Sequence, residues 1–211
     1  MNKLIKILVG IAALVMIYLC VMSVYTPVQF IKEKAQREKV IQKKLKAIST
    51  LEQAYENIYH KYADAQHLQW FLQEGKLYYI KAEGEYTDEM RDKKITEREA
   101  VRQGLLRRDT VWVPVADTLL KNSGITAANL FNVPFSKNPI KLETDFITQT
   151  VGDSEVKVPV FRASLKFKDY LGDLDKVSLS QAISSENAKA NGFPGLVLGS
   201  LKEVKTTGNW E

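Results

Sequence analysis

The strongest constraint in this sequence is an uncharged apolar run near its N-terminus, residues 7–25, which reads ILVGIAALVMIYLCVMSVY. As a helix, these nineteen residues rise about 28 Å, close to the thickness of a bilayer's hydrocarbon core. A single segment in that core must be helical, because no water satisfies its backbone N–H and C=O groups. The run therefore predicts one transmembrane helix, with the lipid bilayer as a partner. The side chains expected to face lipid are Ile7, Leu8, Val9, Ile11, Leu14, Val15, Ile17, Leu19 and Val21.

Three other interpretations of the run compete with a membrane span. A cleaved signal peptide has a shorter apolar core of about 7 to 15 residues, although Val21 and Ser23 form a small-residue cleavage site. A lipoprotein would carry its lipid on Cys20, but the preceding residue is Leu19 rather than a small one. A buried core helix of a soluble protein is the third interpretation, and the basic residues in front of the run disfavour it.

Positive charge is concentrated shortly after the run. The formal net charge is +5, and residues 32–46 hold seven basic side chains against two acidic ones. The basic character therefore belongs to one segment, and the sequence predicts no nucleic-acid partner. If this segment lay in the cytoplasm, it would attract anionic lipids. We favour a solvated spacer that holds the following domain off the membrane.

Basic residues flank the run on both sides, so their count does not fix its orientation. The order of charged tip, apolar core and large domain is that of an uncleaved signal anchor. Long domains translocate with little regard to charge. We therefore expect the N-terminus in the cytoplasm and the domain outside it.

The pattern of apolar residues and turn formers divides the chain into three parts and predicts an α+β fold. Residues 1–25 form the N-terminal tip and transmembrane helix, 26–63 a charged helical stalk, and 64–211 an extramembrane domain with a small antiparallel sheet and flanking helices. Thr26 and Pro27 predict a break between span and stalk. Expected helices cover 64–73, 96–104 and a stretch capped by Ser178 or Ser180 that runs to 190. Expected strands cover 77–80, 110–115, 140–150, 156–167 and 196–204, the third and fourth joined as a hairpin by residues 152–154.

The stalk carries a stripe of apolar side chains at spacings of three and four residues: Ile41, Leu45, Ile48, Leu51, Tyr55, Ile58 and Tyr62. Such a stripe is typical of a coiled-coil seam with a partner chain, the chain itself included. It is equally typical of a helix that packs on its own domain. The sequence leaves both interpretations open, and the tyrosine-rich end favours the second.

No sequence motif indicates an enzyme. The phosphate-loop, dinucleotide-binding, zinc-protease and serine-hydrolase motifs are absent from the sequence. A single cysteine allows no disulfide within the chain. His60, Asp64 and His67 would share one face of a continuous helix and are weak metal candidates, but three ligands make an incomplete site. We expect no catalytic residue, no metal and no cofactor.

The layout of tip, span, stalk and small domain resembles the single-span assembly proteins of type IV pilus and type II secretion machines. The helix ending AYENIYHKYAD is similar to the point where a pilin-type helix meets its globular head. The start MNKLIKILVG lacks the Gly followed by Phe-Thr-Leu-x-Glu of true pilins, so pilin-like polymerisation is not expected.

Four further segments, YTDEM, ITEREAV, RRDTVWVPV and the closing GSLKEV with GNWE, resemble an uncharacterised family of bacterial single-span cell-envelope proteins. This resemblance covers nearly the whole chain. It implies a cell-envelope role, and it carries over no catalytic residue. Together with the expected orientation, we therefore expect a bacterial inner-membrane protein with a periplasmic domain.

Three functions compete on these observations. The first is a non-catalytic structural or interaction component of a cell-envelope assembly, which binds protein partners through its stalk or domain. The second is a membrane-tethered module that binds a ligand on its sheet, and the third is an envelope enzyme. Clustered carboxylates of raised pKa in a polar cleft would favour the third.

Overall fold

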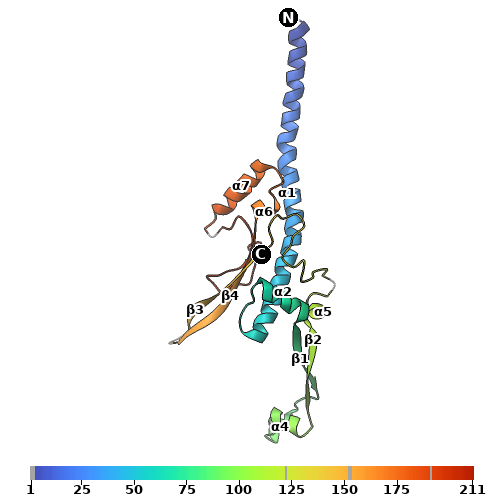
Figure 1. The fold of residues 1–211 in the computed structure, drawn as a ribbon, viewed down its shortest axis with the longest axis vertical. Helices are drawn as coiled ribbons and strands as arrows, with labels where there is room; N and C mark the ends of the chain where they lie inside the picture. The colour runs from blue at the N-terminus through green and yellow to red at the C-terminus, as the bar shows by residue number, and fades with distance from the viewer. Residues whose placement is uncertain (1–2, 122, 152–153, 191) are drawn as a thin grey trace.

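The computed structural model describes residues 3–121, 123–151, 154–190 and 192–211. Its longest element is α1 (Lys3–Tyr59), which projects from one end of the molecule and enters the folded part with its C-terminal half (Figure 1). The expected break at Thr26 and Pro27 is wrong, because α1 continues through both residues. A proline removes one helical hydrogen bond, yet its fixed φ is helical. The long helical stretches on either side absorb that loss.

The N-terminal half of α1 is exposed over its whole apolar run. Among the described residues, α1 is the one helix long and apolar enough to cross a bilayer, with a mean hydropathy of 2.7 over its most apolar stretch. None of that stretch is buried. The nine side chains predicted to face lipid are between 51% and 69% exposed. Signal sequences and core helices can share this length and composition.

The C-terminal half of α1 is the central helix of the hydrophobic core. Ile41, Leu45, Ile48 and Leu51 are fully buried, and Tyr55 is nearly so. Two further members of the predicted stripe, Ile58 and Tyr62, are partly buried against the same core. The stripe thus packs on the protein's own domain, and in this conformation it offers no surface for a coiled-coil partner.

Two separate antiparallel sheets replace the single sheet expected from the sequence. A two-stranded ribbon pairs β1 (Lys76–Glu83) with β2 (Arg107–Pro114). A three-stranded sheet, in the order β3-β4-β5, consists of β3 (Lys141–Val151), β4 (Ser154–Lys166) and β5 (Gly195–Gly199). Of the predicted hairpin turn, residues 152–153 lie outside the described residues.

The last strand is shorter than the predicted 196–204. It ends at Gly199, whose φ of +80° turns the chain out of the strand. The Gly199 N–H donates to the Thr207 carbonyl, and Gly208 forms a bridge with Leu198. The C-terminal tail therefore folds back along β5.

Short helices connect these strands, and their caps explain where they begin. Asp64 caps α2 (Ala65–Glu74) and Thr96 caps α4 (Glu97–Arg102), at the residues where the predicted helices 64–73 and 96–104 begin. The predicted cap of α7 is wrong: Asp175 Oδ2 accepts the Ser178 N–H at 2.7 Å, so the helix begins earlier than Ser178. The other helices are α3 (Asp88–Asp92), α5 (Val115–Leu119) and α6 (Phe167–Tyr170), and α7 covers Lys176–Asn187.

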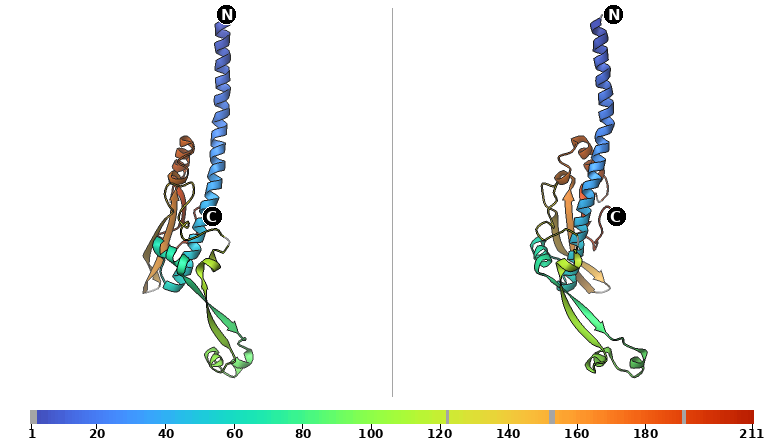
Figure 2. Two further views of the ribbon diagram at one scale, coloured as in Figure 1. Left: turned by 45° about the vertical axis from the view of Figure 1, so that its right-hand side comes forward. Right: turned by 90° about the vertical axis from the view of Figure 1, so that its right-hand side faces the viewer.

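The molecule is elongated, with its two longest projections at opposite ends (Figure 1, Figure 2). The N-terminal half of α1 forms one of them. The β1–β2 ribbon, with α3 and α4 between its strands, forms the other, and we call residues 76–114 the arm. The core lies between them, where α1 contacts α2, β4 and β5.

Candidate interaction surfaces

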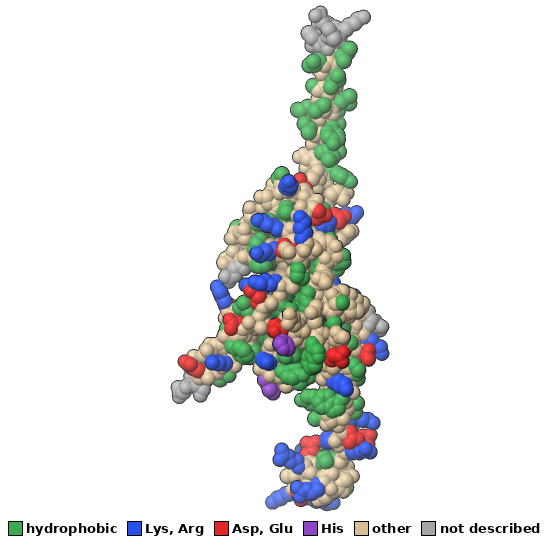
Figure 3. Space-filling view, viewed as in Figure 1, with side chains coloured by type: hydrophobic (Ala, Val, Ile, Leu, Met, Phe, Trp, Pro, Cys, Tyr) green, Lys and Arg blue, Asp and Glu red, His purple; other side chains and the backbone are tan. Residues whose placement is uncertain are grey.

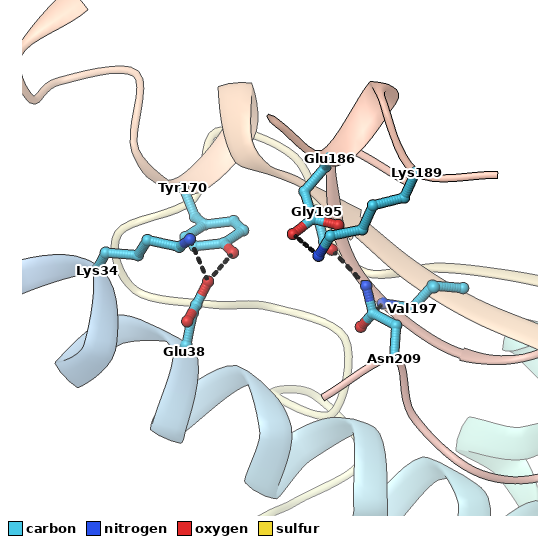
Figure 4. A network of polar contacts seen from close by, with 8 residues as sticks. All are labelled: Lys34, Glu38, Tyr170, Glu186, Lys189, Gly195, Val197 and Asn209. Atoms are coloured by element: carbon cyan, nitrogen blue, oxygen red, sulfur yellow. Dashed lines mark hydrogen bonds and ion pairs between the residues drawn. The ribbon is translucent and has the colours of Figure 1, made fainter. Parts of the chain in front are cut away.

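Ion pairs and hydrogen bonds hold the C-terminal part of the chain against α1 (Figure 4). The buried Tyr170 hydroxyl donates to Glu38 Oε1 at 3.0 Å, and Lys34 Nζ lies 3.8 Å from the same oxygen. Burial raises the pKa of Glu38, although Lys34 and Tyr170 both act to lower it. Burial and the neighbouring Glu38 carboxylate raise the pKa of Tyr170. The tyrosine therefore stays a neutral donor to this carboxylate.

A second contact is made by the residue next to Glu38 on the same helix. The Arg37 guanidinium makes a two-pronged ion pair with Asp173, at 2.6 and 2.7 Å, and also donates to the Tyr170 carbonyl at 2.6 Å. The guanidinium lowers the pKa of the Asp173 carboxyl. Paired N–H donors fix orientation as well as distance. The loop between α6 and α7 is thereby fixed on α1.

Further along α1, two lysines hold the loop that follows α5. Lys43 Nζ donates to the Ser123 carbonyl at 2.9 Å, while Lys44 Nζ donates to the carbonyls of Asn129 and Asn132. The segment predicted as a solvated spacer thus contacts the domain through Lys34, Arg37 and these two lysines. The domain covers α1 from Phe30 onward, and the Phe30 side chain is only 5% exposed. The prediction of a free, solvated stalk is therefore wrong.

A carboxyl group that the sequence analysis missed lies in the core. Glu52 is fully buried, and its Oε2 accepts the Ala63 N–H at 2.9 Å where the chain turns from α1 to α2. Its Oε1 has no hydrogen-bond partner among the described residues. Burial, with a smaller effect of the nearby Asp64, raises the pKa of Glu52 to about 8. The signal in the sequence is its position four residues after Ile48 and three before Tyr55, which places it within the apolar stripe.

The three weak metal candidates do not share a helix face. Helix α1 ends at Tyr59, and His60 has a φ of +55°. Asp64 Oδ1 accepts the His67 N–H at 2.8 Å and lies 2.8 Å from His67 Nδ1, as expected for a capping residue. Across the part of the chain that the structure describes, no group of three or more His, Cys, Asp or Glu side chains is placed to hold a metal.

The arm exposes large apolar side chains. Tyr78 and Trp112 are register partners on one face of the ribbon, with ring centroids 5.7 Å apart, and Ile80 lies on the same face. These three are 49%, 59% and 63% exposed. Tyr79 and Val111 are partners on the other face and are also exposed. Among the described residues, no further layer covers these side chains, so the ribbon presents an apolar surface. A two-stranded ribbon alone is only marginally stable in water.

A groove lies where the arm joins the domain. It has a volume of about 420 Å³ and is lined by Ala54, Asn57, Ile58, Leu77, Tyr78, Tyr79 and Leu119. The lining combines aliphatic and aromatic side chains with Asn57, carries no charged side chain, and comes from α1, β1 and α5. It is therefore better suited to an uncharged group than to a charged one.

No protein-family model, curated protein or solved structure matches this chain. Figure 3 shows the candidate surfaces on one face of the molecule: apolar side chains cover the projecting half of α1, and charged side chains begin where the domain begins. Apolar side chains appear again at the root of the arm, before its charged tip.

Proposed function

We propose that this chain is a single-pass protein of a bacterial inner membrane, with its domain in the periplasm, and a non-catalytic structural or interaction component of a cell-envelope assembly. The observation that carries the proposal is the exposure of the apolar half of α1. Burying apolar surface is the main favourable term in folding. The C-terminal half of α1 follows this rule, because its stripe of apolar side chains is buried in the core of the domain. An uncovered run of residues 7–25 is accounted for by insertion into lipid.

The contacts on α1 support a rigid connection between anchor and domain. Arg37 with Asp173 and Glu38 with Tyr170 join the C-terminal part of the chain to the helix that would cross the membrane. The arm then projects from the end of the molecule opposite the anchor (Figure 1). This arrangement places the exposed aromatic ribbon away from the bilayer, where a protein with an apolar surface would cover it.

The test of the anchor is a pair of reporter fusions after Glu211 in a bacterial host. With alkaline phosphatase, the full chain is expected to be active and to sediment with membranes after alkaline washing, whereas a fusion to green fluorescent protein stays dark. Deletion of residues 7–25 should release the phosphatase fusion from the membrane and abolish its activity, because translocation is lost. A bright fluorescent fusion with inactive phosphatase would place the domain in the cytoplasm and contradict the periplasmic location.

The test of the arm is Trp112→Ser, compared with Trp70→Ser as a matched control. Both tryptophans are more than half exposed, but Trp70 lies on α2 outside the arm. Loss of an aromatic anchor commonly weakens a protein interface by 2 kcal/mol or more, about 30-fold in affinity. We expect cross-linked protein adducts in intact cells to disappear with Trp112→Ser and to persist with Trp70→Ser. Equal adducts in both variants would contradict a role for this face of the arm.

A membrane-tethered ligand-binding module is the alternative, and the groove at the root of the arm favours it. An apolar ligand there would contact Ile58 and Tyr79 and would protect the arm from proteolysis. An envelope enzyme is the second alternative. The carboxyl with the most strongly raised pKa, Glu52, is enclosed in the core rather than placed in a cleft, and so gives this alternative no support.

A further inference from the structure

We propose that the start of α7 lies in the headgroup region of the bilayer, so that the domain is docked on the lipid surface. The contact surface consists of Val28, Ile31 and Lys32 on α1, with Lys176 and Val177 on α7. The inference rests on the proposed membrane anchor, because the anchor places these residues at the bilayer. Its partner is the phospholipid headgroup layer.

Only a short length of helix separates the predicted span from the domain. The predicted span ends at Tyr25, and the domain already covers Phe30. Five residues of helix rise about 7.5 Å. The headgroup layer extends about 5–7 Å beyond the hydrocarbon on each side of a bilayer. The elements that cover Phe30 are therefore at or beside the headgroup layer, and no solvated spacer separates them from it.

Helix α7 is the element of the domain that reaches furthest toward the N-terminal end of α1. Lys34 Nζ lies 4.6 Å from the centre of the Phe167 ring, so α6 is level with this part of α1. The charge of Glu186, near the C-terminal end of α7, acts on both Glu38 and Tyr170. Lys176, the first residue of α7, is ten residues, or about 15 Å of helix, away from Glu186. Figures 1 and 2 show the start of α7 reaching beyond α6 toward the N-terminal end of α1.

This end of the domain exposes aliphatic and basic side chains together. Val177 is 66% exposed, and on α1 Val28 and Ile31 are exposed to a similar degree. Lys32 and Lys176 are exposed beside them. Exposed aliphatic side chains flanked by lysines are the composition of surfaces that lie in a membrane interface, where the amines meet lipid phosphates.

Acidic groups at this end offset part of that charge. The Asp173 carboxylate is paired with Arg37, but Asp175, which accepts the Ser178 N–H as the cap of α7, stays ionised because that hydrogen bond lowers its pKa. Glu33 is half-buried on α1. The groups that would meet anionic phospholipid are therefore the exposed amines of Lys32 and Lys176, beside the aliphatic side chains.

The experiment places a fluorescent label at single cysteines of the full chain in a Cys20→Ser background. Val177→Cys tests the contact. Val156→Cys is the matched control, another exposed valine, on the β3–β4 hairpin that points away from the N-terminal end (Figure 1). Leu14→Cys reports insertion of the span. The protein is reconstituted in phosphatidylcholine vesicles with or without phosphatidylglycerol, carrying a nitroxide either at the headgroup or on the acyl chain.

Expected results are quenching of the Leu14 label by acyl-chain nitroxide and of the Val177 label by headgroup nitroxide, with the Val156 label unquenched. Quenching at Val177 should be stronger with phosphatidylglycerol and should weaken in a Lys32→Glu, Lys176→Glu variant. If Leu14 is quenched while Val177 behaves like Val156, the docking proposal is overturned and the anchor stands. An unquenched Leu14 label overturns the anchor itself and the docking with it. A Val177 label that is shielded from aqueous quencher but not quenched by lipid would indicate a protein cover and would also overturn the proposal.

Discussion

Glu52→Gln is expected to make the protein several kcal/mol more stable above pH 8, while changing its stability little near pH 4. Burial raises the pKa of this carboxyl from 4.5 to about 8 in the folded protein, so the folded state holds a proton that the unfolded state releases. Each pKa unit is worth about 1.4 kcal/mol. The contribution of the protonated group is fully present below pH 4.5, falls as the pH rises, and is lost above pH 8. Glutamine keeps an oxygen for the Ala63 N–H and has no charge to bury.

The measurement is urea unfolding of the full chain in detergent between pH 4 and pH 9. Glu56→Gln is the control, since Glu56 lies one turn further along α1 and is half-buried. The wild type and Glu56→Gln should lose stability as the pH rises from 4.5 to 8, and Glu52→Gln should not. Parallel pH profiles for all three proteins would show that the Glu52 carboxyl titrates normally in the folded state.

Ile48→Ala is expected to cost about 2–5 kcal/mol of the free energy of unfolding, the range for a large aliphatic side chain removed from a packed core. Ile48 is fully buried at the centre of the α1 stripe, between Leu45 and Leu51. Val40→Ala, on the same helix but 41% exposed, should cost less than about 1 kcal/mol. Both changes in the free energy of unfolding would be measured by urea unfolding of the full chain, monitored by circular dichroism.

This comparison also separates the two interpretations of the stripe. Packing on the protein's own domain makes the loss independent of protein concentration, because no partner chain is involved. If the midpoint of Ile48→Ala rose with protein concentration while its cost stayed small, the stripe would instead be a seam between chains.

The predicted elements succeed where the signal is local. The capping residues Asp64 and Thr96 each accept a backbone N–H three residues ahead, as their side chains and positions indicate. The predicted strands at 77–80 and 110–115 exist, because their apolar side chains favour extended backbone. The first is longer than predicted at both ends, and the second begins earlier but ends at Pro114. At Pro27 the local preference for a break fails, because the long helix on both sides decides the backbone.

The candidate surfaces depend on contacts between distant parts of the chain, and for that reason the sequence did not predict them. The arm could not be predicted, because Tyr78 and Trp112 are more than thirty positions apart in the chain, and sequence does not fix which strands form a separate sheet. The metal candidates fail because their spacing assumes a helix that ends at Tyr59. Glu52 occupies a position within the apolar stripe, but a charged side chain on a charged helix is normally solvated, and only the packing of the domain around it decides its burial.

Local sequence is enough to predict the apolar helix, the α+β composition and the stripe on α1, because each depends on side-chain type at a fixed local spacing. Tertiary contacts are needed to place the stripe in the core, to form two sheets and to cover the segment after Phe30 with the domain. They also bring Arg37 to Asp173, 136 residues further along the chain. Contacts of this kind depend on which surfaces exclude water together, and local sequence patterns do not encode that choice.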